Sequence, residues 1–65
     1  MEFHRNMLPS LGVSYHGFET YHEARRFAAW AQRVTRLDRY PCDAYVTRED
    51  DRQEWERWQV KVTNW

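Results

Sequence analysis

The chain has 65 residues, of which ten are basic and ten acidic, and four Trp, four Tyr and three Phe make it rich in aromatic rings. This length allows one domain and leaves no room for a second core, and the zero formal charge argues against a strong electrostatic binder of nucleic acid. The single cysteine, Cys42, excludes an internal disulfide, and we find no membrane span or signal-peptide core, so we expect a cytoplasmic protein.

The first ten residues show no hydrophobic period. Pro9 disfavours a helix in the residue before it, so residues 1–10 are expected to form an extended N-terminal arm. The sequence leaves open whether this arm is loose or covers an edge of the domain with its apolar side chains. Residues 11–65 contain no linker and no repeat, and we expect them to form one domain.

A short strand is predicted at residues 13–18, where side chains alternate between two faces. Val13 and Tyr15 share one face, which we expect on the core side. The opposite face would carry Ser14, His16 and Phe18. Gly17 indicates a bulge or a bend in this strand.

The clearest element is an amphipathic helix of about 16 to 18 residues that begins near Tyr21. Thr20 and Glu23 have the spacing of a capping box, in which each residue satisfies a free amide of the first turn. The helical period puts one apolar stripe toward the core: Ala24, Phe27, Ala31 and Val34. The opposite face is basic, with Arg39 just beyond its end: Arg25, Arg26, Arg33, Arg36 and Arg39.

A hairpin is predicted after Pro41, which cannot continue the helix. Residues 42–48 alternate, so that Cys42, Ala44 and Val46 would face the helix. The charged run 49–54 would form the loop, and the alternation returns from Trp55. A short helical turn over residues 50–58 is the competing interpretation of the charged run.

Together these elements predict an α+β domain of order β-α-β-β, in which one amphipathic helix packs on one face of a three-stranded sheet. The expected core is made of these residues: Val13, Tyr15, Ala24, Phe27, Ala31, Val34, Ala44, Val46, Trp58, Val60 and Val62. The other sheet face would meet water or a partner and is our candidate binding face: Tyr45, Thr47, Arg57, Gln59 and Lys61. The basic helix face is a second candidate surface, for phosphate or for an acidic protein.

Neither catalysis nor metal binding is indicated. Three histidines and Cys42 are present, but none of the usual spacings of metal ligands occurs. Cys42 follows Pro41 on the expected inner face, which suits a small buried residue better than a nucleophile. The acidic residues 49–51 lie at an expected loop tip, where general acid–base chemistry lacks a cleft. We therefore expect a non-enzyme without cofactor or metal.

Four short motifs resemble one half of a SPOR (sporulation-related repeat) domain over residues 13–62. They are the strand VSYHGF at 13–18, Glu23-Ala24 at the helix start, Ala44-Tyr45-Val46, and WQVKV at 58–62. The resemblance implies a ferredoxin-like sheet that binds peptidoglycan glycan strands on its open face. In this chain the corresponding outward residues would be Tyr45, Gln59 and Lys61, and two copies could complete one another's sheet.

The leading hypothesis is a small interaction module that binds a protein partner and works as a homodimer. Two alternatives remain open at this point. One is binding of nucleic acid through the basic helix face, and the other is binding of a glycan on the open sheet face.

Overall fold

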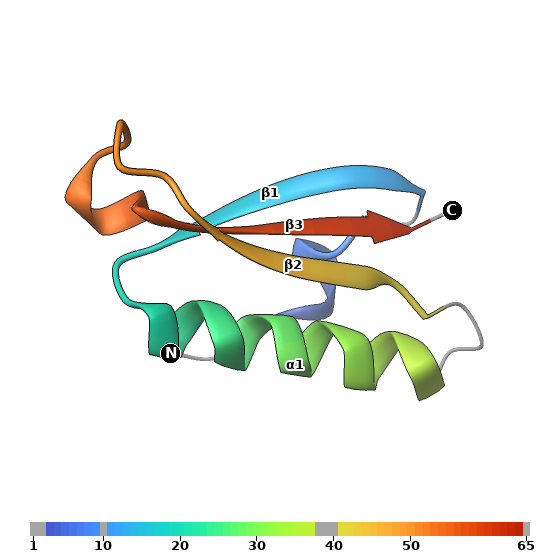
Figure 1. The fold of residues 1–65 in the computed structure, drawn as a ribbon. Helices are drawn as coiled ribbons and strands as arrows, with labels where there is room; N and C mark the ends of the chain where they lie inside the picture. The colour runs from blue at the N-terminus through green and yellow to red at the C-terminus, as the bar shows by residue number, and fades with distance from the viewer. Residues whose placement is uncertain (1–2, 10, 38–40, 65) are drawn as a thin grey trace.

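The computed structural model describes residues 3–9, 11–37 and 41–64. Three strands form one sheet in the order β1-β3-β2, and a single long helix packs against one face of it (Figure 1). The elements have these bounds: β1 Gly12–Phe18, α1 Tyr21–Leu37, β2 Asp43–Arg48 and β3 Trp58–Asn64, with two short 3-10 turns, η1 Arg5–Met7 and η2 Glu54–Glu56. The predicted α+β fold of order β-α-β-β is confirmed.

Strand β3 lies in the middle of the sheet and runs antiparallel to both neighbours. Strands β1 and β2 are therefore parallel to one another, and α1 is the connection that crosses between them. Their outer edges are the two edges of the sheet.

Both interpretations of the charged run were partly right, since β2 and β3 form the predicted hairpin while η2 occupies residues 54–56 within its connection. No helix in the described ranges is long and apolar enough to cross a membrane.

The helix begins where the capping signal places it. The Glu23 backbone N–H donates to Thr20 Oγ1 at 3.2 Å, and the Thr20 hydroxyl donates to Glu23 Oε1, also at 3.2 Å. The first bond satisfies an amide that has no partner within the helix. Helix α1 then runs for 17 residues, in agreement with the predicted length.

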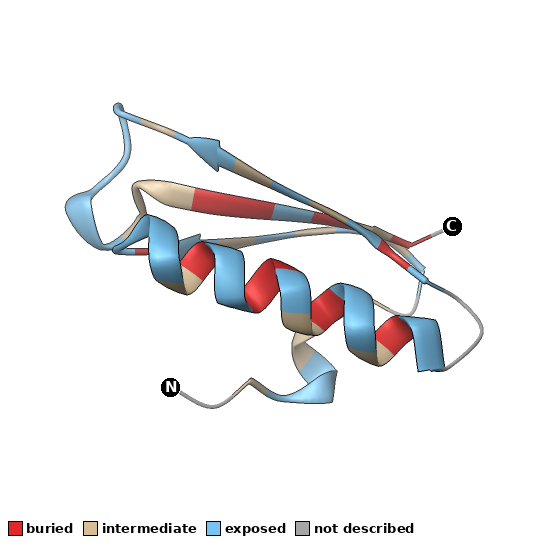
Figure 2. Cartoon of the chain, turned by 60° about the horizontal axis from the view of Figure 1, so that its bottom comes forward, coloured by how far each residue is buried: buried red, intermediate tan, exposed pale blue. Residues whose placement is uncertain are grey.

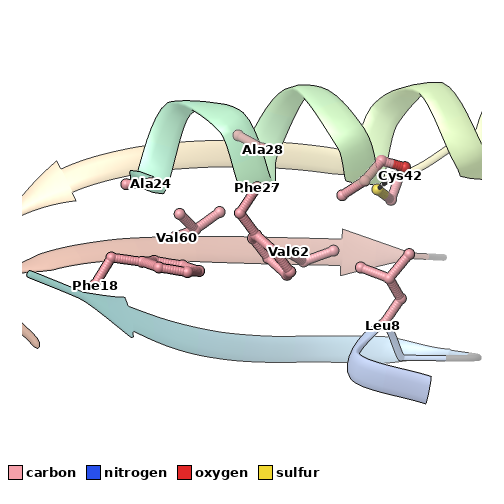
Figure 3. Packing of buried hydrophobic residues seen from close by; sticks show 9 residues of the cluster. Leu8, Phe18, Ala24, Phe27, Ala28, Cys42, Val60 and Val62 are labelled. Atoms are coloured by element: carbon pink, nitrogen blue, oxygen red, sulfur yellow. Dashed lines mark hydrogen bonds between the residues drawn. The ribbon is translucent and has the colours of Figure 1, made fainter. Parts of the chain in front are cut away.

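The core lies between α1 and the sheet, and its centre is Phe27. Phe27, Val60 and Val62 are all fully buried, and Figure 3 shows Phe27 extending from the helix toward β3, between Phe18 and Val62. The ring centroids of Phe27 and Phe18 are 5.2 Å apart. Figure 2 shows that the buried positions of α1 all lie on the side that faces the sheet. Among the described residues, the other buried apolar ones are Leu8, Phe18, Ala24, Ala28, Ala31 and Cys42.

The N-terminal arm covers an edge of this core, which decides between the two possibilities that the sequence leaves open. The ring of Phe3 lies 5.2 Å from that of Phe27 and 5.5 Å from that of Trp30. Leu8 is buried, and the Asn64 side chain donates to the Pro9 carbonyl at 3.1 Å. The arm is not wholly extended, because η1 forms one tight turn within it.

The predicted inner face of β1 is wrong. Val13 and Tyr15 are 40% and 65% exposed, so they belong to the outer face and not to the core. Phe18 is buried instead, and His16 lies on the inner face with its ring 4.7 Å from that of Phe27. This inner face tolerates polar residues because Ser14 and His16 hydrogen-bond to one another at 3.0 Å.

The last turn of α1 also differs from expectation. Val34 was expected in the core, but it is half-buried, and Thr35 is the buried residue at 1% exposure. The Thr35 hydroxyl donates to the Ala31 carbonyl at 2.7 Å and accepts the Cys42 backbone N–H at 3.0 Å. Thr35 thus holds the start of β2 against the end of the helix. Because its hydroxyl is hydrogen-bonded, a polar residue is tolerated at a buried position where the helical period predicts an apolar one.

Candidate functional site

The outer sheet face carries a row of three side chains, one from each strand. Tyr15 in β1 and Tyr45 in β2 both pair with Lys61 in β3. Directly opposed residues in such ladders have Cβ atoms about 5 Å apart, so Lys61 is flanked by a tyrosine on each side. Tyr15 is 65% and Tyr45 58% exposed. We call this row, with Val13 beside it, the tyrosine face.

One end of the outer face is closed by η2. Gln59 lies on this face as predicted, but it is only 7% exposed, and its amide donates to the Glu56 carbonyl at 2.6 Å. Gln59 is therefore covered, whereas Lys61 and Thr47 are exposed. Arg57 is half-buried just before β3, and its Nε has no hydrogen-bond partner among the described residues. The open part of the face is the tyrosine row and the end of the sheet beyond it.

Gly17 makes the closure by η2 possible. A bulge or a bend was predicted at this position, and the bulge is absent, because the pairing with β3 runs without interruption through Gly17 and Gln59. A Cβ atom at Gly17 would lie 2.5 Å from Glu56 Cβ and 2.9 Å from Gln59 Nε2. The glycine therefore allows the close approach of η2 to the outer surface of β1.

The two edges of the sheet differ in their protection against pairing with another chain. Natural edge strands usually carry charges, proline or a bulge that discourage such pairing. Strand β2 carries Asp43 and Arg48, whereas β1 has the sequence GVSYHGF, with no acidic residue, lysine, arginine or proline. In the described ranges β1 forms no backbone hydrogen bonds beyond those to β3.

The basic face of α1 is as the sequence predicts for the residues that the structure describes. Each of these four arginines is exposed and forms no ion pair with any described residue: Arg25, Arg26, Arg33 and Arg36. Arg39 lies outside the described residues. Two of the arginines border a groove of about 300 Å³, whose lining is Phe3, Arg26, Ala29, Trp30 and Arg33. We call it the arginine groove.

The β2–β3 connection is acidic and carries an exposed aromatic ring. Trp55, in the middle of η2, is 64% exposed and is flanked in the sequence by Glu54 and Glu56. Arg48, the last residue of β2, pairs with Asp50 of this connection at 2.7 Å, and its guanidinium lies 5.7 Å from the centre of the Trp58 ring. The sequence alone singled out neither Trp55 as exposed nor Phe3 as part of a groove.

His16 gives the domain a pH dependence. Burial lowers the pKa of His16 below 6.5, and a hydrogen bond to the Met7 backbone opposes this shift in part. The unfolded chain then binds the proton more readily than the folded chain. We expect the free energy of unfolding to be largest above pH 6.5 and to fall as the pH drops through 6.5 toward the lower pKa of the folded state.

Urea denaturation at about pH 7.5 and pH 5 measures this effect. The variant His16→Gln should lose part of the difference between the two pH values, while His22→Gln, which removes an exposed histidine, should keep it. Equal pH dependence in His16→Gln and the wild type would contradict the assignment.

Metal-ligating side chains do not converge where the structure describes the chain. No group of three or more His, Cys, Asp or Glu residues in the described ranges is placed to hold a metal ion. Cys42 is buried next to Thr35, with the Ala31 carbonyl 3.6 Å from its Sγ. The described residues present these candidate surfaces: the tyrosine face, the β1 edge, the arginine groove and the acidic loop of residues 49–57.

No protein-family model, curated protein sequence or solved structure matches the chain.

Proposed function

We propose that the chain is a non-catalytic interaction module that works as a homodimer and binds a protein partner on its tyrosine face. The supporting observation is where the exposed apolar surface lies. Val13, Tyr15 and Tyr45 are large, exposed and gathered on one uncovered sheet face. Apolar surface gathered in this way, with tyrosines that offer a large ring and a hydrogen-bonding hydroxyl, is typical of protein interfaces.

The homodimer forms by antiparallel pairing of β1 with β1 of a second copy. Because β1 lacks the charges that β2 carries, a second β1 strand can approach the backbone N–H and C=O groups of this edge without charge repulsion. Pairing would join two three-stranded sheets into one continuous sheet. Helix α1 covers one side of the sheet (Figure 1). The strand register and the exposure of Tyr15 and Tyr45 place the tyrosine face on the other side, so the helix does not obstruct it.

The area of the outer sheet face explains why a dimer binds a partner better than a monomer does. Three strands of about seven residues make a face of about 14 by 23 Å, or about 320 Å², from the strand spacing and rise. A standard protein interface needs about 800 Å² from each side, so one copy offers too little surface. Six joined strands double the face and place two tyrosine rows on it. The doubled face is about 640 Å², so the module approaches the area of a standard interface only when it is paired.

The two tyrosines provide a matched test, because they lie in the same row on opposite edges. We expect the wild type in about 0.5 M salt, where surface attractions are screened, to have twice the monomer mass of 8.1 kDa. Tyr15→Lys puts like charges close together at the β1 edge and should yield monomers. Tyr45→Lys makes the same change at the β2 edge and should leave the dimer intact. Light scattering over a concentration series measures both, and loss of the dimer in Tyr45→Lys alone would refute pairing through β1.

Nucleic-acid binding by the basic face of α1 is a second candidate function. The four exposed arginines support it, since they form no ion pair with a described residue and can neutralise phosphates. A polyanion column tests this function. Retention of the wild type that falls with salt, and loss of retention in Arg25→Glu/Arg33→Glu, would favour nucleic-acid binding over binding of a protein partner. Glycan binding, implied by the SPOR resemblance, is the third candidate. It should survive those arginine changes and fail in Tyr45→Ala.

A further inference from the structure

The arginine groove combines an apolar wall with two positive charges. Phe3 and Trp30 supply rings, and Ala29 leaves a small side chain between Arg26 and Arg33. The two arginines are seven residues apart in α1, which places their Cα atoms about 10 Å apart along the helix axis. A fitting occupant would insert an aromatic or apolar group over Ala29 and present an acidic group to each arginine.

The acidic loop of the same chain has this composition. Its 3-10 turn η2 has the sequence Glu54-Trp55-Glu56, and Trp55 is exposed. Residues 49–57 contain five acidic and two basic side chains, a net charge of −3, whereas α1 contains four arginines and one glutamate, a net charge of +3. The loop is thus complementary to the groove in charge as well as in its exposed ring.

Loop and groove cannot meet within one molecule. Turn η2 rests on the outer surface of β1, where a Cβ atom at Gly17 would collide with Glu56. The groove lies on α1, which covers the inner face of the sheet, so the sheet and the helix separate the two (Figure 1). Only a second copy can bring Trp55 to the groove.

We propose that the loop at residues 49–57 of one copy docks into the arginine groove of another, with Trp55 against Phe3 and Trp30. Glu54 and Glu56 then pair with Arg26 and Arg33. This contact joins two different surfaces, so it does not close on itself as a two-fold dimer does and it continues into a chain or a ring of copies. It is independent of the β1 pairing proposed above and differs from it in being sensitive to salt.

Light scattering on the full chain tests this proposal through salt and concentration. At low ionic strength we expect the mass to rise with concentration beyond that of the β1-paired dimer, and to return to it at about 0.5 M salt. If β1 pairing does not occur, the same rise in mass should start from the monomer. The mass at high salt therefore tests β1 pairing, and the rise in mass at low salt tests the loop–groove contact. A mass that does not change with salt at any concentration would overturn the loop–groove contact.

Matched variants locate the contact. Arg26→Ala/Arg33→Ala removes the groove charges, and Arg25→Ala/Arg36→Ala removes two arginines from the same helix that do not line the groove. The first change should weaken the salt-sensitive association about tenfold or more, as loss of close charge pairs does. The second should weaken it far less. Equal weakening by both would show general charge attraction and refute the groove as the docking site.

Complementation provides the decisive readout. A Glu54→Ala/Trp55→Ala chain keeps the groove and lacks the loop, while Arg26→Ala/Arg33→Ala keeps the loop and lacks the groove. Neither variant should form the loop–groove contact alone. In an equimolar mixture, the intact loop of one variant should dock into the intact groove of the other and give a complex of two chains. All four residues are on the surface, and unchanged circular dichroism of each variant would show that folding is retained. A mixture that associates no better than its components would overturn the proposal.

Discussion

Replacing Phe27 by alanine is expected to lower the free energy of unfolding by about 3–5 kcal/mol. Phe27 is fully buried and its ring packs on three aromatic rings from other segments, those of Phe3, His16 and Phe18. The arm and β1 both lose a shared partner on the helix in this variant, and the cavity would lie at the centre of the core between α1 and the sheet. A small domain has about 5 kcal/mol of stability at the lower end of the usual range, so the variant should keep only about 0–2 kcal/mol and its urea midpoint should fall close to zero.

Leu37→Ala is the matched control for this change, since Leu37 lies on the same helix and is 82% exposed. Its urea midpoint should stay close to that of the wild type, because exposed positions contribute within about 0.5 kcal/mol. A wild-type midpoint for Phe27→Ala would show that the helix does not present this face to the sheet.

Replacing Gly17 by alanine is expected to cost about 1–3 kcal/mol, as overpacking of a tight contact does. The new methyl would come within 2.5 Å of Glu56 Cβ and 3.1 Å of Glu56 Cα, so η2 as a whole would have to move away from β1. Gln59 would also lose the cover under which it hydrogen-bonds to Glu56.

Thr47→Ala serves as the control for this second change, because Thr47 pairs with Gln59 from the other side in the same row and is exposed. Urea denaturation should separate the two variants clearly. If Gly17→Ala is as stable as Thr47→Ala, η2 does not rest on β1 and Gln59 is open to ligands after all.

The helix and the hairpin could be predicted because local signals specify them. Thr20 and Glu23 fix the helix start, and the spacing of Ala24, Phe27 and Ala31 fixes its inner face without reference to the rest of the chain. The faces of β2 and β3 were also predicted, since Val60 and Val62 alternate with clearly polar neighbours.

The faces of β1 could not be predicted in the same way. Val13 and Tyr15 are more apolar than Ser14 and His16, so local pattern favoured the wrong side. What decides the orientation is tertiary packing: Phe18 joins the core, and the N-terminal arm, which shows no period of its own, covers the polar part of the inner face. Burial of His16 against Phe27 becomes acceptable because Ser14 and the Met7 backbone satisfy its ring.

The candidate site was predicted only in part, because it too depends on tertiary contacts that no local pattern shows. The sequence placed Tyr45 and Lys61 on the open face, but Tyr15, which completes their row, was assigned to the core. Closure by η2 over Gln59 depends on a contact between residues about 40 positions apart in the chain, Gly17 and Glu56, and no local pattern contains it. The arginine groove likewise exists only because the arm places Phe3 beside Trp30.

Amide hydrogen exchange in the two edge strands is the most direct test of the proposed β1-paired dimer. In the dimer the outward backbone N–H groups of β1 are hydrogen-bonded to the second copy, while those of β2 remain free, so the β1 amides should exchange more slowly and slow further as protein concentration rises. High salt should not abolish this difference, because backbone hydrogen bonds carry it. Outward amides of β1 that exchange as fast as those of β2 at every concentration would contradict pairing through β1 and, with it, the doubled face on which the proposed function depends.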